Sequence, residues 1–228
     1  MQFLARRDEH AVEEMDRTDC DPVRLENTYR QFRLVNAAVS GWQLTWARLV
    51  RPVLSTSRPT TLLDVGSGAG DIPRAFVRWA ARDGFALHVT AIDPDERAHA
   101  YLRSLPPLPG LTVRRAHTAD LVAEGARYDV VTSNHLLHHL DAGQLDGLLR
   151  DSAALAGRLA VHSDIARTRL GYALFSAGTL PLPGSFIRAD GLTSIRRSYR
   201  PDELRAAVPA GWRVESQIPF RNLLVRRG

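Results

Sequence analysis

An acid followed by three alternating glycines forms the stretch of this chain that is best suited to hold a small ligand. Asp64 stands two residues before Gly66, and Gly68 and Gly70 follow at every second position. Glycine adopts positive φ without strain and lets a ligand approach the bare backbone. The third glycine comes too early for the Gly-x-Gly-x-x-Gly turn of dinucleotide sites, and the chain has no lysine for a P-loop. With Asp71, Asp64 favours a cationic ligand without phosphate, such as an ammonium or a sulfonium.

A second acid, Asp93, follows the apolar run 86–92, which reads as a strand. An acid at the end of such a strand can accept hydrogen bonds from ribose hydroxyls. The same residue could also cap a helix over 95–103. A ribose contact would serve NAD as well as other nucleoside cofactors, so Asp93 predicts a nucleoside without identifying it.

Three histidines, His135, His138 and His139, follow a β-branched run at 128–132. In a helix their spacing places them on one face, and histidine has a suitable pKa for removing a proton near neutral pH. His138 is the first candidate for a general base, with His135 and His139 as alternatives. A further alternative is that none of the three histidines is catalytic. Metal ligands one turn apart rarely close a site without a carboxylate from elsewhere, for which Asp164 is available. We expect no metal.

Composition bounds the class of protein. The 228 residues suffice for one α/β domain with a full core. The net charge of +5 comes from arginines scattered among 25 acids, so we expect no nucleic-acid partner, and arginine in place of lysine suggests a GC-rich bacterial genome. No run is long and apolar enough for a membrane span. The single cysteine, Cys20, excludes an internal disulfide and fits a cytoplasmic location.

Hydrophobic periodicity predicts the elements that position these residues. Helical spacing over 23–39 and 42–50, with a polar helix over 9–15, suggests an N-terminal helical cap at residues 1–55. Its side chains Tyr29, Phe32, Asn36 and Trp42 could line a ligand cleft, or its helices could simply cover the sheet edge. Strands expected at 61–65, 86–92, 111–116, 128–132 and 159–165 alternate with helices, and two short strands end the chain. Residues 56–228 would then form the ligand-binding domain, with a substrate-side insertion at 166–198 whose second half, 185–198, reads as a loop.

The order of these motifs resembles class I S-adenosylmethionine (SAM) dependent methyltransferases. The resemblance covers residues 61–227 and implies a Rossmann-like α/β/α sheet of seven strands, parallel except for the last. By resemblance Asp120 faces the adenine amino group, and His138 corresponds to the general base of aromatic O-methyltransferases, although His139-Leu140 departs from their Asp/Asn-Trp. The implied cofactor-binding residues are Asp64, Gly66, Ser67, Gly68, Gly70, Asp93, Pro94, Asp120, Leu121 and Asn134.

The resemblance also implies a function. More narrowly, the chain looks like bacterial methyltransferases of polyketide or quinone-type aromatics, on the Leu-Leu-His-His-Leu and Ser-Phe-Ile-Arg stretches. We therefore expect methyl transfer from SAM to a hydroxyl or ring carbon of a small aromatic natural product, by a monomer or a homodimer. The alternatives left open are an NAD(P)-dependent oxidoreductase and a SAM-binding protein that does not methylate.

Overall fold

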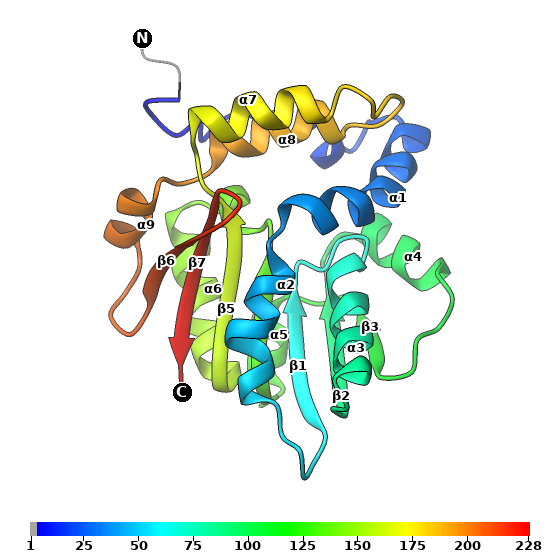
Figure 1. Cartoon of the computed structure of the whole chain (residues 1–228), viewed down its shortest axis with the longest axis vertical. Coiled ribbons are helices and arrows are strands. Elements are labelled where there is room, and N and C mark those ends of the chain that lie inside the picture. Colours follow the sequence, from blue (N-terminus) through cyan, green and yellow to red (C-terminus); the bar gives the residue numbers. More distant parts are fainter. Residues whose placement is uncertain (1–3) are drawn as a thin grey trace.

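A single seven-stranded sheet forms the centre of the protein. The computed structural model describes residues 4–228. The strand order is β3-β2-β1-β4-β5-β7-β6, and β7 runs antiparallel to both β5 and β6 while the remaining pairs are parallel. This confirms the predicted Rossmann-like sheet whose last strand alone is reversed (Figure 1). The strands are β1 (Thr60–Val65), β2 (Leu87–Ile92), β3 (Leu111–Arg114), β4 (Tyr128–Asn134), β5 (Ala156–Ile165), β6 (Arg213–Gln217) and β7 (Arg221–Arg227).

Helices cover both faces of the sheet and the carboxyl ends of its parallel strands (Figure 1). The α-helices are α1 (Pro22–Val39), α2 (Trp42–Thr45), α3 (Asp71–Arg82), α4 (Glu96–Ser104), α5 (Thr118–Ala123), α6 (Ala142–Leu155), α7 (Arg169–Gly178), α8 (Ile187–Arg197) and α9 (Pro201–Ala207). The short helical segments are η1 (Glu14–Asp16), η2 (Trp46–Val50), η3 (Arg51–Val53) and η4 (Leu137–His139). No helix within residues 4–228 combines the length and apolarity needed to cross a membrane.

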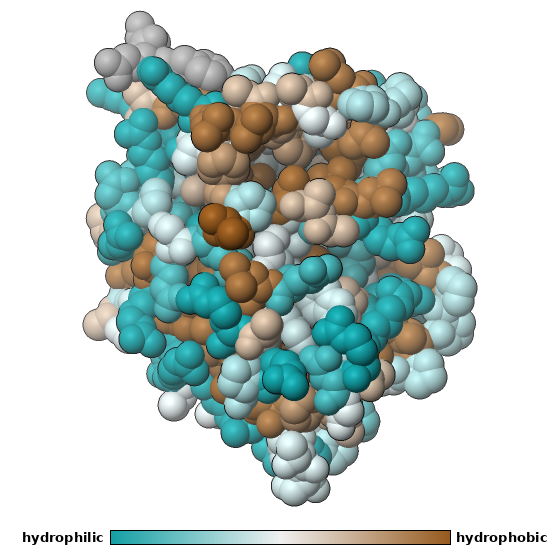
Figure 2. Space-filling model, viewed as in Figure 1, coloured by the Kyte–Doolittle hydropathy of each residue, from teal (hydrophilic) through white to brown (hydrophobic). Residues whose placement is uncertain are grey.

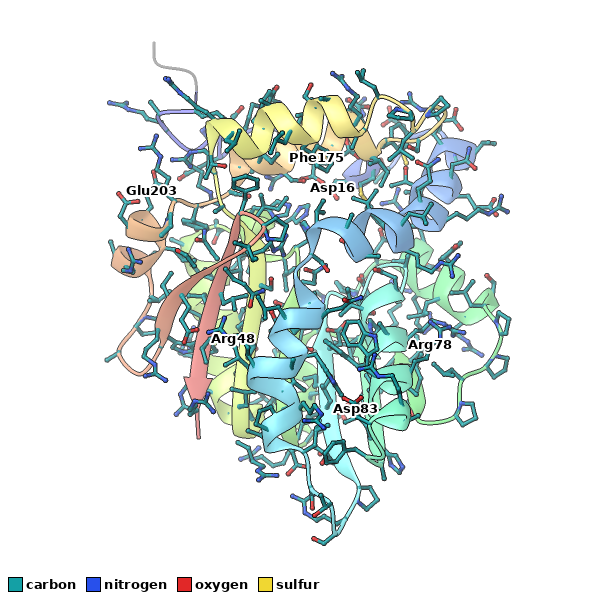
Figure 3. All side chains as sticks on the ribbon, in the orientation of Figure 1. Asp16, Arg48, Arg78, Asp83, Phe175 and Glu203 are labelled. Carbon is teal, nitrogen blue, oxygen red and sulfur yellow. The ribbon has the colours of Figure 1, made fainter. Side chains whose placement is uncertain are left out.

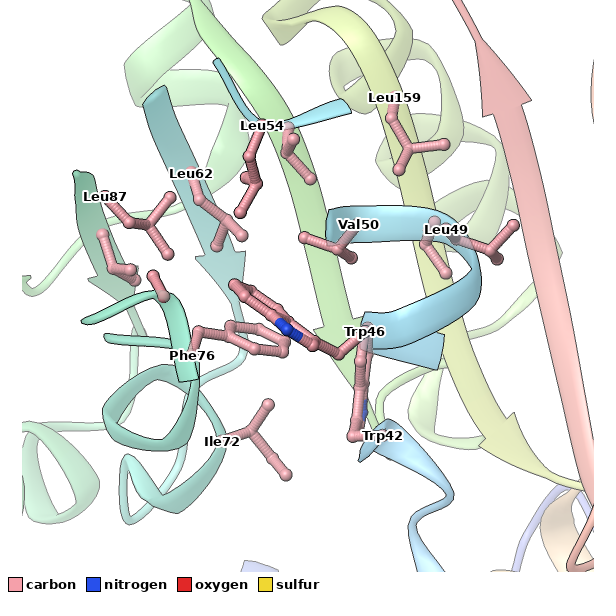
Figure 4. Close-up of a cluster of buried hydrophobic side chains, with 14 of the residues drawn as sticks. Trp42, Trp46, Leu49, Val50, Leu54, Leu62, Ile72, Phe76, Leu87 and Leu159 are labelled. Atoms are coloured by element: carbon pink, nitrogen blue, oxygen red, sulfur yellow. The ribbon is translucent and has the colours of Figure 1, made fainter. Parts of the chain in front are cut away.

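The core has one apolar cluster on each face of the sheet. On the first face, Trp42 and Trp46 pack against Phe76 of α3, with ring centroids 5.0 and 5.7 Å from it (Figure 4). On the second face, side chains of α5, α6 and α9 cover β4 and β5. Trp42 is therefore a core residue rather than a wall of the cleft, because α2 and η2 lie on the sheet.

A cap assembled from two distant segments lies across the carboxyl ends of the parallel strands. It consists of η1, α1, α7 and α8 (Figure 1). The start of α1 is set by Asp21, whose side chain accepts two backbone hydrogen bonds, and by Pro22 in the first turn. Two sequence predictions were wrong here: residues 9–15 contain only the start of the one-turn helix η1, and 185–198 is mainly the helix α8. The division into domains at residue 55 stays a prediction.

Candidate functional site

The glycine turn between β1 and α3 has the backbone that its sequence predicts. Gly68 and Gly70 have φ of 51° and 74°, in the left-handed region. A Cβ at Gly70 would lie 2.2 Å from Leu102 Cδ1, so this glycine permits close packing on α4. A Cβ at Gly68 would meet no atom within 4 Å, because this backbone faces open space. Gly68 is therefore where a ligand can approach the main chain.

Asp93 joins the glycine turn to the loop after β2. Its Oδ2 accepts a hydrogen bond of 2.8 Å from the Gly68 N–H, and its Oδ1 accepts one of 2.9 Å from the Asp95 N–H. Burial raises the pKa of Asp93. Both loops therefore keep a fixed geometry around this carboxyl group, with Pro94 beside it on the cavity wall.

A cavity of about 290 Å³ opens above the glycine turn and is rich in acids. Burial, with the nearby charges of Asp71 and Asp93, raises the pKa of Asp64 to about 8, and Thr132 Oγ1 donates to it at 2.8 Å. Burial also raises the pKa of Asp71, which accepts a hydrogen bond from Asn36 of α1. Buried carboxyl groups with raised pKa values gain from a neighbouring cation, so this cavity fits a cationic nucleoside.

The predicted cofactor residues divide into two groups. Those on the cavity wall are Asp64, Gly66, Ser67, Gly68, Asp93, Pro94 and Asn134. The side chains of Asp120 and Leu121 have other contacts: Asp120 accepts the His117 N–H at 2.8 Å at the start of α5, and Leu121 is buried in the core. Their predicted adenine contact therefore stays a prediction. Gly70 is not on the cavity wall and instead allows the glycine turn to pack closely on α4.

The three histidines do not share a helical face, which corrects the sequence interpretation. His135 directly follows β4 with φ of 55°, and only Leu137–His139 forms a short 3-10 helix. His135 Nε2 accepts a hydrogen bond of 3.0 Å from Arg221. Burial and the Arg221 charge hold the pKa of His135 well below its usual value, so this ring is neutral.

His138 lies between two buried carboxylates. Its Nδ1 is 2.8 Å from Asp164 Oδ1, and its Nε2 is 3.3 Å from Glu13 Oε1 in an ion pair that lacks hydrogen-bond alignment. Burial disfavours the charged ring, but Asp164 and Glu13 outweigh burial and raise the pKa of His138 to about 9. The same contacts hold the pKa of Asp164 far below its usual range. At neutral pH the ring is therefore an imidazolium.

Glu13 is the main site residue that the sequence did not reveal. It is 3% exposed, lies on the cavity wall, and accepts a hydrogen bond of 2.7 Å from Ser194 of α8 through Oε1. Its Oε2 makes no hydrogen bond to residues 4–228. Burial raises the pKa of Glu13, but His138 and His139 more than offset this and lower it. Glu13 belongs to a polar stretch without a motif, and only the fold brings it close to the histidines.

His139 completes a group of facing acids and imidazoles. Its Nδ1 is 3.2 Å from Asp16 and its Nε2 is 3.9 Å from Glu13. The ligand atoms of Glu13, His138 and His139 lie within 4.8 Å of one another, a grouping that could hold a metal ion. Because each imidazole already faces a carboxylate, the charges pair without a metal, and the expectation of no metal stays a prediction.

A second, apolar cavity adjoins the first beneath the cap. Its volume is about 440 Å³, and it lies between α1, α7 and the turn that joins β6 to β7. Both cavities are lined by Val35, Val39, Ile165 and Phe175. Figure 3 shows Phe175 and Asp16 between the cap helices and the sheet. The cap therefore encloses two adjoining chambers, one acidic and one apolar, and the expected wall residues Tyr29, Phe32 and Asn36 line the acidic one.

Comparison with known proteins identifies the family. Residues 41–209 match the family model described as a methyltransferase domain. The chain belongs to this family. No curated protein matches the chain. The match spans both the glycine turn and the histidine segment, and the protein is a SAM-dependent methyltransferase rather than an oxidoreductase or a binder that does not methylate.

Solved methyltransferase structures share the fold. The plantazolicin methyltransferase BpumL with S-adenosylhomocysteine (SAH) is 11% identical, with a TM-score of 0.58 over 90% of this chain and 96% of that one. The carbon methyltransferase CurJ is 15% identical, with a TM-score of 0.63 over 93% and 62%. Magnesium protoporphyrin IX methyltransferase from Synechocystis PCC 6803, with bound SAM, is 13% identical, with a TM-score of 0.52 over 92% and 86%. At these identities the likeness concerns the fold.

Proposed function

We propose that this methyltransferase transfers the methyl group of SAM to a hydroxyl or a ring carbon of a small aromatic natural product. The observation that carries the proposal is the pair of adjoining chambers, because a cationic nucleoside suits the acidic one and an aromatic acceptor suits the apolar one. When bound, SAM supplies a methyl group on a positively charged sulfur. The chain contributes alignment and exclusion of water, which methyl transfer needs more than a charged clamp.

Each cofactor contact in the proposal has a defined donor or acceptor. Asp93 would accept hydrogen bonds from the ribose hydroxyls, and the Gly66–Gly68 backbone would lie against the nucleoside. Asp64 would face the cationic part, since a cation relieves the cost of ionising its buried carboxyl group. Asp120 and Leu121 remain the proposed adenine neighbours through the loop after β3.

We place proton removal on the pair formed by Glu13 and His138. His138 is already protonated at neutral pH, so Glu13 is the immediate proton acceptor. Its Oε2 would bind the acceptor hydroxyl; as the oxygen–methyl bond forms and the sulfur–methyl bond breaks, the hydroxyl proton passes to Glu13. His138, held by Asp164, keeps Glu13 in place and supplies a compensating charge. Removing the proton from a phenolic hydroxyl of the methyl acceptor would also activate its ring for methylation at carbon.

Cofactor binding and methyl transfer together test this proposal. Isothermal calorimetry should show micromolar SAH binding to the wild type, weakened at least about tenfold by Asp93→Ala, because two loops lose their link and the ribose loses its acceptor. The control is Asp146→Ala, which removes an exposed acid of α6. Transfer of tritium from labelled SAM to a panel of phenols should accompany binding. Wild-type protein that binds no SAH would overturn the assignment.

A further inference from the structure

We propose that the acceptor carries an uncharged apolar body that fills the second cavity and extends over its outer edge. This inference rests on the proposed function, since it names the class of molecule that the apolar chamber would take. The cavity is lined by Leu34, Val35, Ala38, Val39, Ile165, Gly171, Leu174, Phe175, Gly178, Thr179, Pro181, Leu182, Ile195, Pro219, Phe220 and Arg221. Apolar side chains dominate this lining, and a single charged residue belongs to it.

That charged residue, Arg221, is held by buried protein partners, which take four of its five N–H groups. Its guanidinium is 1% exposed and donates to Ser163, Asn134 and His135. Burial lowers the pKa of Arg221 to about 10, so it stays charged and committed to these partners. An acceptor carrying a carboxylate or a phosphate in this chamber would lose its hydration against a lining that is mostly apolar. The lining therefore selects against charged bodies.

The outer edge of the chamber is also apolar. Five of the eight large hydrophobic side chains that are exposed in the described chain gather here, each 55–76% exposed. We call these residues the apolar rim: Leu34, Leu170, Leu174, Leu180 and Ile218. Leu34 and Leu174 line the cavity itself, and the other three directly adjoin lining residues. Figure 2 shows hydrophobic side chains gathered over the cap around a hollow. Such a concentration marks a binding surface.

The place of the chamber argues for a small molecule rather than for a protein or a membrane. The chamber shares four wall residues with the acidic cavity, so a molecule inside it lies beside the cavity that contains Glu13 and His138. Its volume of about 440 Å³ lies within the range of small-molecule pockets. A partner helix or a lipid surface would cover the rim but leave the chamber beneath it unfilled.

A filling variant tests occupancy of the chamber without needing turnover. Gly178 lines the chamber at the end of α7, and a Cβ there would meet no atom within 4 Å, so Gly178→Leu projects into free space. The control Gly147→Leu places the same side chain in equally open space on α6, away from both cavities. Binding of 4-alkylphenols is followed by calorimetry. We expect Gly178→Leu to weaken the binding of 4-hexylphenol at least tenfold and Gly147→Leu to leave this binding unchanged. Both variants should bind SAH with the same affinity.

A chain-length series tests the rim. Each added methylene should strengthen 4-alkylphenol binding about three- to fourfold until the rim is covered. The double variant Leu170→Ser, Leu180→Ser, which changes only rim residues outside the cavity lining, should weaken the binding of 4-decylphenol about tenfold or more and leave the binding of 4-methylphenol unchanged. Unchanged 4-hexylphenol binding in Gly178→Leu would overturn the proposal. So would phosphatidylcholine vesicles that bind through the rim while the alkylphenols show no chain-length effect. Absent SAH binding would instead count against the proposed function, while the alkylphenol results would still stand.

Discussion

At the scale of residues, the proposed role of Glu13 as proton acceptor leads to the most specific prediction. Its Oε1 takes the contacts to Ser194 and His138, and its Oε2 is left for a ligand. We predict that Glu13→Gln lowers kcat by about 10²-fold or more while the KM for SAM changes little, because the amide keeps the shape but cannot accept a proton. Tritium transfer from labelled SAM measures both constants. The matched control is Glu14→Gln, the exposed neighbour in η1. Equal kcat in wild type and Glu13→Gln would remove Glu13 from the mechanism.

The second prediction at this scale concerns Asp64 and the release of a proton when the cofactor binds. In the free protein its pKa is raised to about 8, so it is largely protonated at pH 7. A bound cation lowers that pKa, so SAM binding should release up to about one proton near pH 7 and tighten as pH rises from 6 to 8. Calorimetry in two buffers of different ionisation heat measures the release. Asp64→Asn should abolish it; an unchanged release would place the proton elsewhere.

At the scale of elements, Asp190 fixes the backbone of η1 over the site, in addition to the side-chain contacts of Glu13 and Asp16. Asp190 of α8 accepts the backbone N–H groups of Glu14 and Met15 at 2.7 and 3.0 Å. We predict that Asp190→Ala raises amide exchange at these two residues about tenfold, since two hydrogen bonds of about 1 kcal/mol each are lost. Hydrogen exchange followed by mass spectrometry measures this. Asp146→Ala serves as the control, and equal protection in wild type and Asp190→Ala would show that other contacts hold η1.

These elements also show which parts of the fold could be predicted from the sequence. Helical spacing over 23–39 predicted α1, and the apolar runs predicted the strands, because these signals are local. The contact between Asp190 and Glu14 spans 176 residues and leaves no local pattern. The helix α8 was missed because Ser185–Ser198 is polar and includes Gly191, which lets Phe175 of α7 approach closely. Helical spacing alone did not distinguish Trp42 as a core residue from a cleft wall.

At the scale of the whole molecule, buried charges connect the cap to the sheet. His138 links Glu13 of the N-terminal segment to Asp164 at the end of β5. Arg221 of β7 joins this group through Asn134 of β4 and His135, which follows it. Two acids and two cations thus lie together in buried positions, and their formal charges cancel. Removing one partner leaves another buried and unpaired, which is costly. The network that organises the site therefore also contributes to folding.

This coupling predicts how stability depends on pH. The pKa of His138 is about 9 in the folded protein, against 6.5 for a free histidine side chain. Its contribution is therefore complete below pH 6.5 and is lost as pH rises through 9, by roughly 3 kcal/mol. The lowered pKa values of Asp164 and Glu13 reflect the same contacts and are not added. We expect the free energy of unfolding in urea to fall across this range in the wild type and in His88→Gln, an exposed control. His138→Gln should be less stable at pH 6.5 and should show a smaller fall, which ends near pH 8, because Asp64 with its raised pKa of about 8 still contributes there. Parallel curves would mean that His138 is not an imidazolium.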